Sequence, residues 1–563
     1  MKKHKNLIIL TALVTLLLLD LGIYWNAHLY YSALKTNNSA KKASLLETAN
    51  KIFPFNELVW TELGEFYFRA GTNKLNDPDL TKLNLEKARR SLNRAVKLNP
   101  GFYKSHFYLA HTLLYLSYFS SVDVNAYEAF KKAALLTTFD SQIYFEVGRI
   151  MLSNWDNIAE PDKNFTIDLL KNIVASGDEE KLLNVLLIWS MNISDYNVAE
   201  QIIPNDPSSY RLYSGFLGEK ALSLRERHKY LIKAETREFL EAKREYIRGN
   251  REFNLFQINN ALEHYQKSLK LLDGIRFYQN FSEEQPINTS EYDELLKDVY
   301  LAIVRVWIQK ENGYNKAEPY LLHYLDLEND LSRLDELETF LQSKRLLVVK
   351  PTEMENDPES LYFKTLLNYK MNRFQMIVTE WESYREKYFI PPPEKKEYYL
   401  RLFQIVGDSY QKIDFIYNAE DFHQKALDID PNRLDTLLRM RLNHLRQNDQ
   451  NKLKQIDKKI ETMVTPREIE FNDLIIEKSR SWDIPMTIEG NPIRVSLFLK
   501  EETPQAKIPL VTVLFNGKVI FEDFVLENII TFEIDPQPLV NKIQIIPLNQ
   551  KVILQWMVIE NTA

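Results

Sequence analysis

The sequence has no cysteine among its 563 residues. Disulfide bonds, thiolate zinc sites, iron–sulfur clusters and cysteine nucleophiles are therefore excluded. Only 14 residues are glycine, and this low content disfavours phosphate-binding glycine loops and the doubly wound α/β folds that contain them. The Gly-x-x-x-x-Gly-Lys loop, the Gly-x-Ser-x-Gly turn and the His-Glu-x-x-His helix are also missing. We therefore expect a protein that is not an enzyme and that has no cofactor or metal ion.

An excess of positive charge is missing as well. The formal net charge is -7 and the sequence pI is about 5.9, which argues against a nucleic-acid-binding surface that extends over the chain. Hydrophobic residues make up 45% of the sequence and charged residues 26%, a balance typical of folded proteins. Because 563 residues exceed the size of one hydrophobic core, we expect several domains or one long array of repeats.

One long hydrophobic run lies at the N-terminus. Three lysines precede Leu7–Trp25, which is largely apolar apart from Asp20 and would span roughly 28 Å as a helix. A cleaved signal peptide is the alternative, but no small-x-small cleavage site follows closely. Trp25, Tyr30 and Tyr31 resemble an interfacial aromatic belt instead. The sequence therefore predicts an uncleaved transmembrane signal anchor, whose lysines keep the N-terminus in the cytoplasm and whose body is extracytoplasmic.

The stretch Leu400–Arg433 has the residue spacing of two paired helices. A large, an apolar, a small and an aromatic residue follow one another at helical spacing, and two alanines and a proline come after them. These residues are Phe403, Val406, Gly407, Tyr410, Ala419, Ala426 and Pro431. Small residues let two helices approach closely, and the proline ends the second helix. The spacing resembles that of the tetratricopeptide repeat (TPR) family, whose 34-residue units are helix pairs that stack on one another.

The same pattern recurs earlier in the chain. Leu46, Ala49 and Pro54 have the spacing of the second helix of a repeat, and Gly64 and Gly148 hold the small-residue position of later first helices. The pattern is weaker between residues 155 and 217, although helical periodicity continues there. We therefore expect a mainly α protein, with an α-solenoid of TPR-like helix pairs over residues 26–464.

After about Thr465 the apolar residues alternate, as they do in strands. Asn516-Gly517 lies between two apolar runs and predicts a hairpin, because both turn positions need a positive φ. Six or seven short strands predict a small β-sandwich, either a jelly roll or immunoglobulin-like. The predicted organisation is a cytoplasmic N-terminus over residues 1–6, the transmembrane anchor over 7–25, the α-solenoid over 26–464 and the sandwich over 465–563.

The TPR resemblance implies that the concave face of the array binds partner proteins or peptides. In TPR arrays the second, fifth, ninth and twelfth positions of each first helix contact the ligand. In this sequence those positions are Leu58, Thr61, Glu65, Phe68, Lys104, Phe107, His111, Leu114, Gln142, Phe145, Arg149, Leu152, Arg401, Gln404, Asp408 and Gln411. The N-terminal members are partly aromatic and apolar, whereas the C-terminal members are polar, so we expect an apolar or aromatic peptide anchor near the membrane end.

Two other features have a structural interpretation. His106 and His423 occupy positions of large residues in their repeats, which favours core packing over metal binding. The stretch Arg225–Arg248 mixes Arg, Lys and Glu with opposite charges at helical spacing. We interpret it as a solvated helix face, and an electrostatic docking site is the alternative.

The functional expectation is a non-enzymatic, membrane-anchored scaffold that binds partner proteins on the extracytoplasmic side. The layout resembles that of bacterial anchored TPR proteins that accompany surface-polysaccharide synthesis and export. The alternative is a carbohydrate-binding surface protein that acts through its β-sandwich, with Trp482, Trp556 or an exposed strand face as the platform. An exposed aromatic row on one sheet face would favour this alternative.

Overall fold

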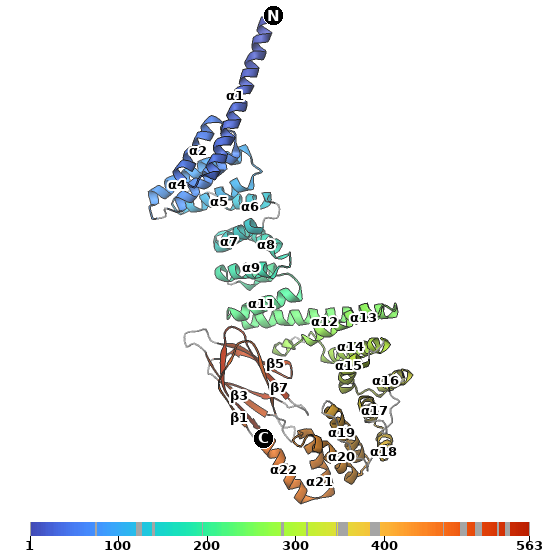
Figure 1. Ribbon diagram of the computed structural model, residues 1–563. Helices are drawn as coiled ribbons and strands as arrows, with labels where there is room; N and C mark the ends of the chain where they lie inside the picture. Colours follow the sequence, from blue (N-terminus) through green and yellow to red (C-terminus); the bar gives the residue numbers. More distant parts are fainter. Residues whose placement is uncertain are drawn as a thin grey trace. The chain divides into compact units, whose positions relative to one another are not determined.

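The computed structural model describes residues 2–73, 76–119, 126–137, 141–193, 195–282, 286–310, 314–344, 346, 358–382, 395–464, 467–484, 493–501, 509–525, 529–534 and 541–561. Within them the chain forms helices α1–α22, the short 3-10 helices η1 and η2, and strands β1–β8 (Figure 1). It divides into two compact units, Met1–Asn205 and Asp206–Ala563. The predicted fold class is confirmed: an N-terminal apolar helix precedes a TPR-like α-solenoid, and a β-sandwich follows.

Unit 1 is helical throughout the part that the structure describes. Its helices are α1 (Lys2–Lys35), α2 (Ser39–Ile52), α3 (Glu57–Thr72), α4 (Pro78–Leu98), α5 (Tyr103–Ser117), α6 (Ala126–Leu136), α7 (Ser141–Ser153), η1 (Trp155–Asn157), α8 (Glu160–Val174), α9 (Glu179–Asn192) and α10 (Tyr196–Ile202). α3 packs on α4, α5 on α6 and α7 on α8. Asn38, Asn56 and Asp77 accept backbone N–H groups at the starts of α2, α3 and α4, which is why these helices begin there.

Helix α1 belongs both to the apolar run and to the array. Its segment Leu10–Lys35 is long and apolar enough to cross a membrane, and residues 10–21 are all exposed. Further along, Ala33 is buried against Leu46 and Val59, with Leu29 and Tyr30 packed beside it. The C-terminal part of α1 therefore forms the first helix that pairs with α2.

Unit 2 contains further helix pairs and the sandwich. Its helices are α11 (Pro207–Glu219), α12 (Leu224–Asn254), α13 (Ile258–Asp273), η2 (Tyr278–Phe281), α14 (Thr289–Gln309), α15 (Tyr314–Leu327), α16 (Leu331–Ser343), α17 (Pro358–Lys370), α18 (Phe374–Glu382), α19 (Lys396–Lys412), α20 (Ile416–Ile429), α21 (Leu434–Gln447) and α22 (Gln450–Val464). One apolar core runs from α14 to α20. The helices therefore stack on their neighbours as a repeat array does.

Glycines mark the closest approach of paired helices. A Cβ added at Gly64 of α3 would lie 2.4 Å from Cγ of Leu92 in α4, and one added at Gly407 of α19 would lie 2.4 Å from the His423 ring in α20. Both glycines stand at the small-residue position that the repeat pattern predicts. His106 and His423 are buried, so the prediction that they pack in the core is confirmed.

The sandwich consists of two four-stranded antiparallel sheets. Its strands are β1 (Arg467–Ile476), β2 (Arg480–Ile484), β3 (Ile493–Glu501), β4 (Leu510–Phe515), β5 (Lys518–Phe524), β6 (Ile529–Ile534), β7 (Asn541–Pro547) and β8 (Val552–Asn561). The sheet orders β1-β8-β3-β6 and β2-β7-β4-β5 are those of a jelly roll, one of the two sandwich types predicted. The hairpin is confirmed, since Asn516 and Gly517 join β4 to β5 with φ of 48° and 83°.

The outer face of the β2-β7-β4-β5 sheet packs against α12 and η2. Every residue of β4 is buried, as expected for a strand with packed layers on both faces. Leu514 and Val519 contact Leu231 and Tyr278 in a small apolar cluster. The Val519 N–H also donates to the carbonyl of Arg276 at 3.2 Å. The sandwich is thus joined to the array by apolar packing and by a backbone hydrogen bond.

A buried ion pair completes this contact. Nε of Arg227 in α12 lies 2.5 Å from Oε1 of Glu522 in β5, and the Thr512 hydroxyl donates to Oε2 at 2.7 Å. Burial would raise the pKa of the Glu522 carboxyl, but His228, Arg227 and Thr512 outweigh it and lower that pKa to about 2. Glu522 is therefore charged at neutral pH and needs its partner.

The interpretation of Arg225–Arg248 as a solvated face is wrong at several positions. Arg227, Glu235, Glu238 and Glu245 are buried in the structure. Glu235 accepts the backbone N–H groups of Arg276 and Tyr278, which places η2 against the sandwich. The alternative of an electrostatic docking site holds for the start of α12, and the element that docks there is the sandwich of the same chain.

Candidate partner-binding surface

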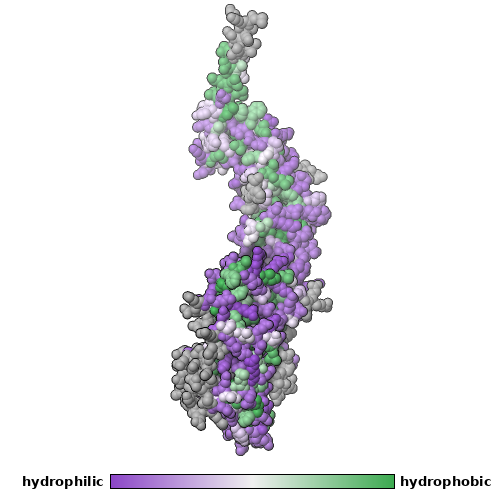
Figure 2. Space-filling view, turned by 90° about the vertical axis from the view of Figure 1, so that its right-hand side faces the viewer, coloured by the Kyte–Doolittle hydropathy of each residue, from purple (hydrophilic) through white to green (hydrophobic). Residues whose placement is uncertain are grey.

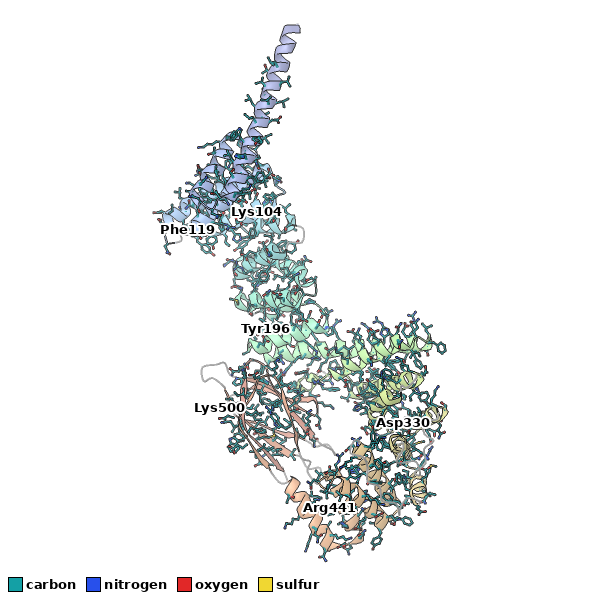
Figure 3. The ribbon with its side chains drawn as sticks, in the orientation of Figure 1. Lys104, Phe119, Tyr196, Asp330, Arg441 and Lys500 are labelled. Carbon is teal, nitrogen blue, oxygen red and sulfur yellow. The ribbon has the colours of Figure 1, made fainter. Side chains whose placement is uncertain are left out.

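The first helices α3 and α5 carry a cluster of charged side chains. Nζ of Lys104 (labelled in Figure 3) lies 2.8 Å from Oε1 of Glu62 and 2.8 Å from Oε2 of Glu65. Nη2 of Arg69 lies 2.5 Å from Oε1 of Glu65. Two predicted groove positions of successive repeats, Glu65 and Lys104, are therefore in direct contact.

Their environment keeps these groups charged. Burial alone would raise the pKa of Glu65, but the Lys104 ammonium and the Tyr108 hydroxyl hold that pKa below its usual value. Burial alone would lower the pKa of Lys104, but Glu62 and Glu65 raise it above its usual value. These side chains therefore stay ionised at neutral pH; Glu65 is buried, and the Arg69 guanidinium is the most exposed charge of the cluster.

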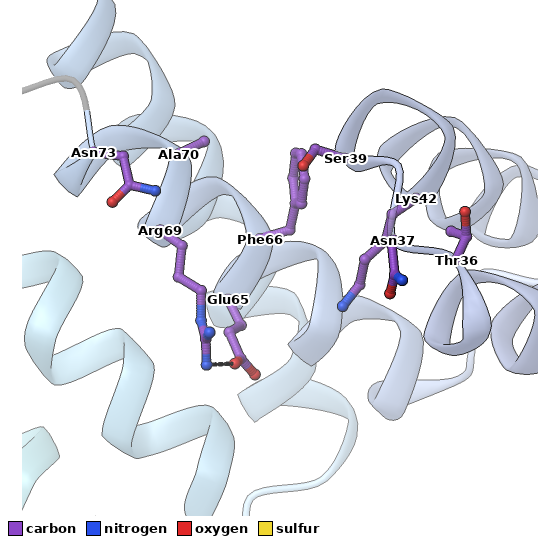
Figure 4. Close-up of a pocket in the computed structure, with 9 residues that line it drawn as sticks. All are labelled: Thr36, Asn37, Ser39, Lys42, Glu65, Phe66, Arg69, Ala70 and Asn73. Atoms are coloured by element: carbon purple, nitrogen blue, oxygen red, sulfur yellow. Dashed lines mark hydrogen bonds and ion pairs between the residues drawn. The ribbon is translucent and has the colours of Figure 1, made fainter.

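A pocket of about 430 Å³ opens beside this cluster. Figure 4 shows its lining, which comes from the α1–α2 connection, α2 and α3: Thr36, Asn37, Ser39, Lys42, Glu65, Phe66, Arg69, Ala70 and Asn73. Lys42 and Arg69 supply positive charge, Phe66 supplies an apolar ring, and the amides and hydroxyls can donate and accept hydrogen bonds. This combination suits an extended peptide, which presents backbone amides together with a side chain or a carboxylate.

An aromatic cluster follows along the same helices. His111 of α5 lies edge-on to Phe107 at 4.6 Å and to Phe130 of α6 at 5.0 Å, and it meets Phe68 of α3 at 5.6 Å. The ring centroids of Tyr115 and Phe68 lie 5.7 Å apart. The predicted positions Phe68, Phe107 and His111 are thus brought together. Burial, opposed by Glu146 and aided by Arg149, lowers the pKa of His111 to about 4.

We expect unit 1 to lose stability as the pH falls from about 6.5 towards 4. The unfolded chain takes up a proton at His111 in this range, whereas the folded chain, with its lowered pKa, does not, so acid favours unfolding. Over the whole window the loss is up to about 3 kcal/mol. Above about pH 6.5 the imidazole is neutral in the folded and in the unfolded chain, so it does not make the stability depend on pH. The measurement is the free energy of opening of the α5 amides by hydrogen exchange, between pH 7 and pH 4. His111→Gln should flatten the profile, and an equal slope in both proteins would contradict the assignment.

The remaining N-terminal positions vary in exposure. Leu58 and Gln142 are exposed, Leu114 and Phe145 are partly buried, and Leu152 is buried. Thr61 is buried and its hydroxyl lies 2.7 Å from that of Ser105 in the next first helix. Arg149 is exposed and forms an ion pair with Glu146. The predicted N-terminal positions therefore differ in how far a partner can reach them.

The C-terminal positions contact the next repeat. Gln404 donates to the Thr436 hydroxyl at 2.6 Å, and Gln411 donates to Asn443 at 2.7 Å. Asp408 accepts from Arg439 at 2.8 Å and from His423 at 3.1 Å. Arg401 bonds to Glu397 within α19. These side chains hold α19 against α20 and α21, so their role in partner binding stays a prediction.

Several pocket residues are outside the predicted set. Lys42 comes from α2, and Phe66, Arg69 and Asn73 lie next in sequence to predicted groove positions of α3 or shortly after them. One signal was available in the sequence, because Glu65 and Arg69 form an opposite-charge pair four residues apart. Lys42 had no such signal, since its place depends on how α1 folds back onto α2.

The two tryptophans of the sandwich occupy different environments. Trp482 of β2 packs edge-on against Phe471 at 5.3 Å and against the sandwich core. Trp556 of β8 pairs in register with Phe498 of β3, and both are partly buried on the outer face of their sheet. The exposed aromatic row that would favour carbohydrate binding is therefore reduced to this pair among the described residues.

Comparisons with known proteins give structural neighbours only. No protein-family model and no curated protein matches the chain. Among solved structures, the Naa15/Naa10 complex bound to HypK-THB matches with 12% identity over 78% of this chain and 63% of that chain, with a TM-score of 0.25. The TPR domain of P58(IPK) matches with 14% identity, 71% and 92% coverage and a TM-score of 0.17. The TPR2AB domain of yeast Sti1 in complex with pHSP90 matches with 16% identity, 39% and 90% coverage and a TM-score of 0.16.

These neighbours are TPR-repeat proteins. The chain spans just under two thirds of the length of the first of them. Because the TM-scores are low, the likeness is one of repeated helix pairs and does not extend to the path of the whole chain. The assignment of the repeats therefore depends on the helix pairing and on the glycine contacts described above.

Proposed function

We propose that this chain is a non-enzymatic scaffold, which α1 anchors in a membrane and which binds a partner protein or peptide on the face formed by α3, α5 and α7. The observation that carries the proposal is that Glu65 lines an open pocket and pairs with Lys104 of the next first helix, while Phe68, Phe107 and His111 form an aromatic cluster on the same two helices. Fixed charges give such a surface specificity, and the aromatic rings supply apolar area. An extended segment with one cationic or anionic group and one apolar side chain is the partner that this surface fits.

The membrane part of the proposal is supported by α1. Its exposed apolar surface has the length that a bilayer requires, and three lysines precede it. By the positive-inside rule, the array and the sandwich then lie on the extracytoplasmic side. Extraction of the intact chain from membranes by detergent, but not by carbonate or high salt, tests the anchor. Protease digestion of sealed cells tests the side.

Partner binding is tested by crosslinking in cells. A photoreactive residue at Ala70, which lines the pocket, is expected to capture a partner that one at the exposed Arg90 of α4 does not. Arg69→Glu should lower the yield about tenfold, because it places a second acid beside Glu65 and costs at least about 1.4 kcal/mol of affinity. Mass spectrometry identifies the captured protein.

A matched control comes from α4. Arg89 forms an ion pair with Glu86 at 2.8 Å, comparable to the pair of Arg69 with Glu65, but it does not line the pocket. Arg89→Glu should therefore leave the crosslink at Ala70 unchanged. Equal capture at Ala70 and Arg90, or equal effects of the two charge reversals, would argue against this face as the binding surface.

A carbohydrate-binding sandwich is the second candidate. The observation that favours it is the pair of Phe498 and Trp556 on the outer sheet face, since sugars stack on aromatic rings. Tryptophan fluorescence of the full chain, titrated with oligosaccharides, should then show a shift that Trp556→Ala removes. The absence of any shift would leave the sandwich with the docking role seen at α12.

A further inference from the structure

Helix α2 returns towards the apolar end of α1. Residues 36–38 alone join the two helices, which pack against each other. α2 has 14 residues and so rises roughly 21 Å. The same length measured back along α1 from Lys35 ends near Leu21, inside the apolar run. Ile52, the last residue of α2, and the α2–α3 turn after it therefore lie beside the point where α1 leaves the array.

Asn26 fixes the turn at that point. It directly follows the apolar run and is 1% exposed. Its Nδ2 donates to the carbonyls of Ala49 at 2.8 Å and Phe53 at 3.1 Å, and its Oδ1 accepts from Nδ2 of Asn56 at 2.6 Å. The amide thus uses both donors and its acceptor on the last turn of α2 and on the α2–α3 turn. The height of the turn along α1 is set by these bonds and not by a flexible linker.

Around Asn26 the surface is aromatic and apolar. Trp25 is 48% exposed, Ile52 43% and Phe55 59%; we call these three residues the turn patch. The Trp60 indole donates to the Pro54 carbonyl at 3.0 Å, which orders the turn that carries Phe55. In Figure 2 the hydrophobic surface of α1 continues down to the body of unit 1. Because Trp25 is the last residue of the apolar run and is itself exposed, the turn patch adjoins the exposed apolar surface of α1.

We propose that the turn patch lies in the headgroup region of the bilayer that α1 spans, so that the array is seated directly on the membrane. This inference rests on the proposed function, because it takes α1 as the anchor. The hydrocarbon core ends near Trp25, and the headgroup region beyond it is about 5–7 Å deep on each side. The turn is bonded to the very next residue and so lies within that depth. Tryptophan and phenylalanine side chains favour this region, and the exposed Lys51 beside them can reach lipid phosphate.

The chain has no cysteine, which allows single spin labels to be placed without removing native thiols. The full-length protein is reconstituted in phosphatidylcholine vesicles with labels at Phe55→Cys, Leu16→Cys or Leu135→Cys. Leu16 lies in the exposed apolar part of α1, and Leu135 of α6 is 73% exposed and apolar but far along the array. Relaxation by oxygen, which concentrates in lipid, is compared with relaxation by a water-soluble nickel complex.

Labels at Leu16 and Phe55 should relax faster with oxygen than with nickel, and the label at Leu135 should show the reverse. Asn26→Ala should shift the ratio at Phe55 towards that at Leu135 without changing the ratio at Leu16. If the label at Leu16 reports lipid while the label at Phe55 reports water, the turn patch does not lie in the headgroup region. The proposal that α1 anchors the chain in the membrane is then still supported. If Phe55 is shielded from both agents, the turn patch is covered by protein and the lipid assignment is overturned. If Leu16 itself reports water, the anchor proposal fails.

Discussion

Glu522→Gln is expected to detach the sandwich from α12 at a cost of about 3–5 kcal/mol. The substitution leaves the buried Arg227 guanidinium without the carboxylate that it contacts at 2.5 Å, and an unpaired buried charge carries a penalty of this size. The sandwich has its own apolar core, so it should stay folded while the contact opens. Hydrogen exchange is the measurement, and the amide of Val519, which bonds to Arg276 across the contact, should lose its protection.

Two controls separate docking from general loss of charge. Glu533 pairs with Arg494 at 2.6 Å on the exposed surface of the same sandwich, and Glu533→Gln should leave the stability and the protection of Val519 unchanged, because solvent screens an exposed pair. The double variant Arg227→Met/Glu522→Leu should recover much of the loss, because neither charge is left alone. Unchanged protection of Val519 in the Glu522→Gln protein would show that apolar packing alone holds the sandwich.

The pH dependence of the contact follows from the same pair. The folded-state pKa of Glu522 is about 2, below the ordinary value. The stabilisation of the folded state by the charged Glu522 carboxylate is therefore fully present above about pH 4.5 and is lost as the pH falls towards 2. The Glu522→Gln protein should lack this acid-induced opening, and the Glu533→Gln protein should retain it.

Gly64→Ala is expected to destabilise unit 1 by about 1–3 kcal/mol, although alanine is the better helix former. The new Cβ would lie 2.4 Å from Cγ of Leu92, which is buried and cannot move aside without separating α3 from α4. Urea unfolding followed by far-ultraviolet circular dichroism measures the change. The loss of unfolding free energy in the double variant Gly64→Ala/Leu92→Ala should be smaller than the sum of the losses in the two single variants. Leu92→Ala removes the side-chain atoms that the new Cβ at position 64 would clash with.

Gly215 of α11 is the matched control. It is also a helical glycine, but a Cβ added there meets no atom within 4 Å. Gly215→Ala should therefore stabilise the protein by up to about 1 kcal/mol. Effects of the same sign at Gly64 and Gly215 would show that close helix approach is not what selects glycine at the repeat position.

The repeats could be predicted because their signals are local. Gly407 and the residue it contacts, His423, lie within one 34-residue unit, so spacing alone indicates the pair. The hairpin at Asn516-Gly517 could also be predicted from the sequence, since a positive φ at both turn positions restricts the residue types there. The choice between a jelly roll and an immunoglobulin-like sandwich could not be predicted. The jelly-roll strand order depends on pairings between distant strands, such as β1 with β8, that no short segment encodes.

The candidate surface could be predicted in part for the same reason. The contact of Phe68 with His111 joins the twelfth groove position of one first helix to the ninth of the next, both of which the repeat pattern identifies. Lys42 was missed because it belongs to a second helix that the α1–α2 connection places beside α3. The docking role of Arg227 was missed because its partner, Glu522, is 295 positions away. The opposite charges at helical spacing within α12 were enough to explain Arg227 as part of a solvated helix face.

The return of the sandwich to α12 has a mechanical consequence. Stacked repeats with free ends behave as springs, since small rotations at each interface add up along the array. In unit 2 the last helix, α22, leads within three residues into β1, and the same sandwich is bonded to α12 through Glu522. A tensile load applied between α12 and α22 is therefore shared between two parallel paths, and the helices can extend only after the sandwich contact ruptures.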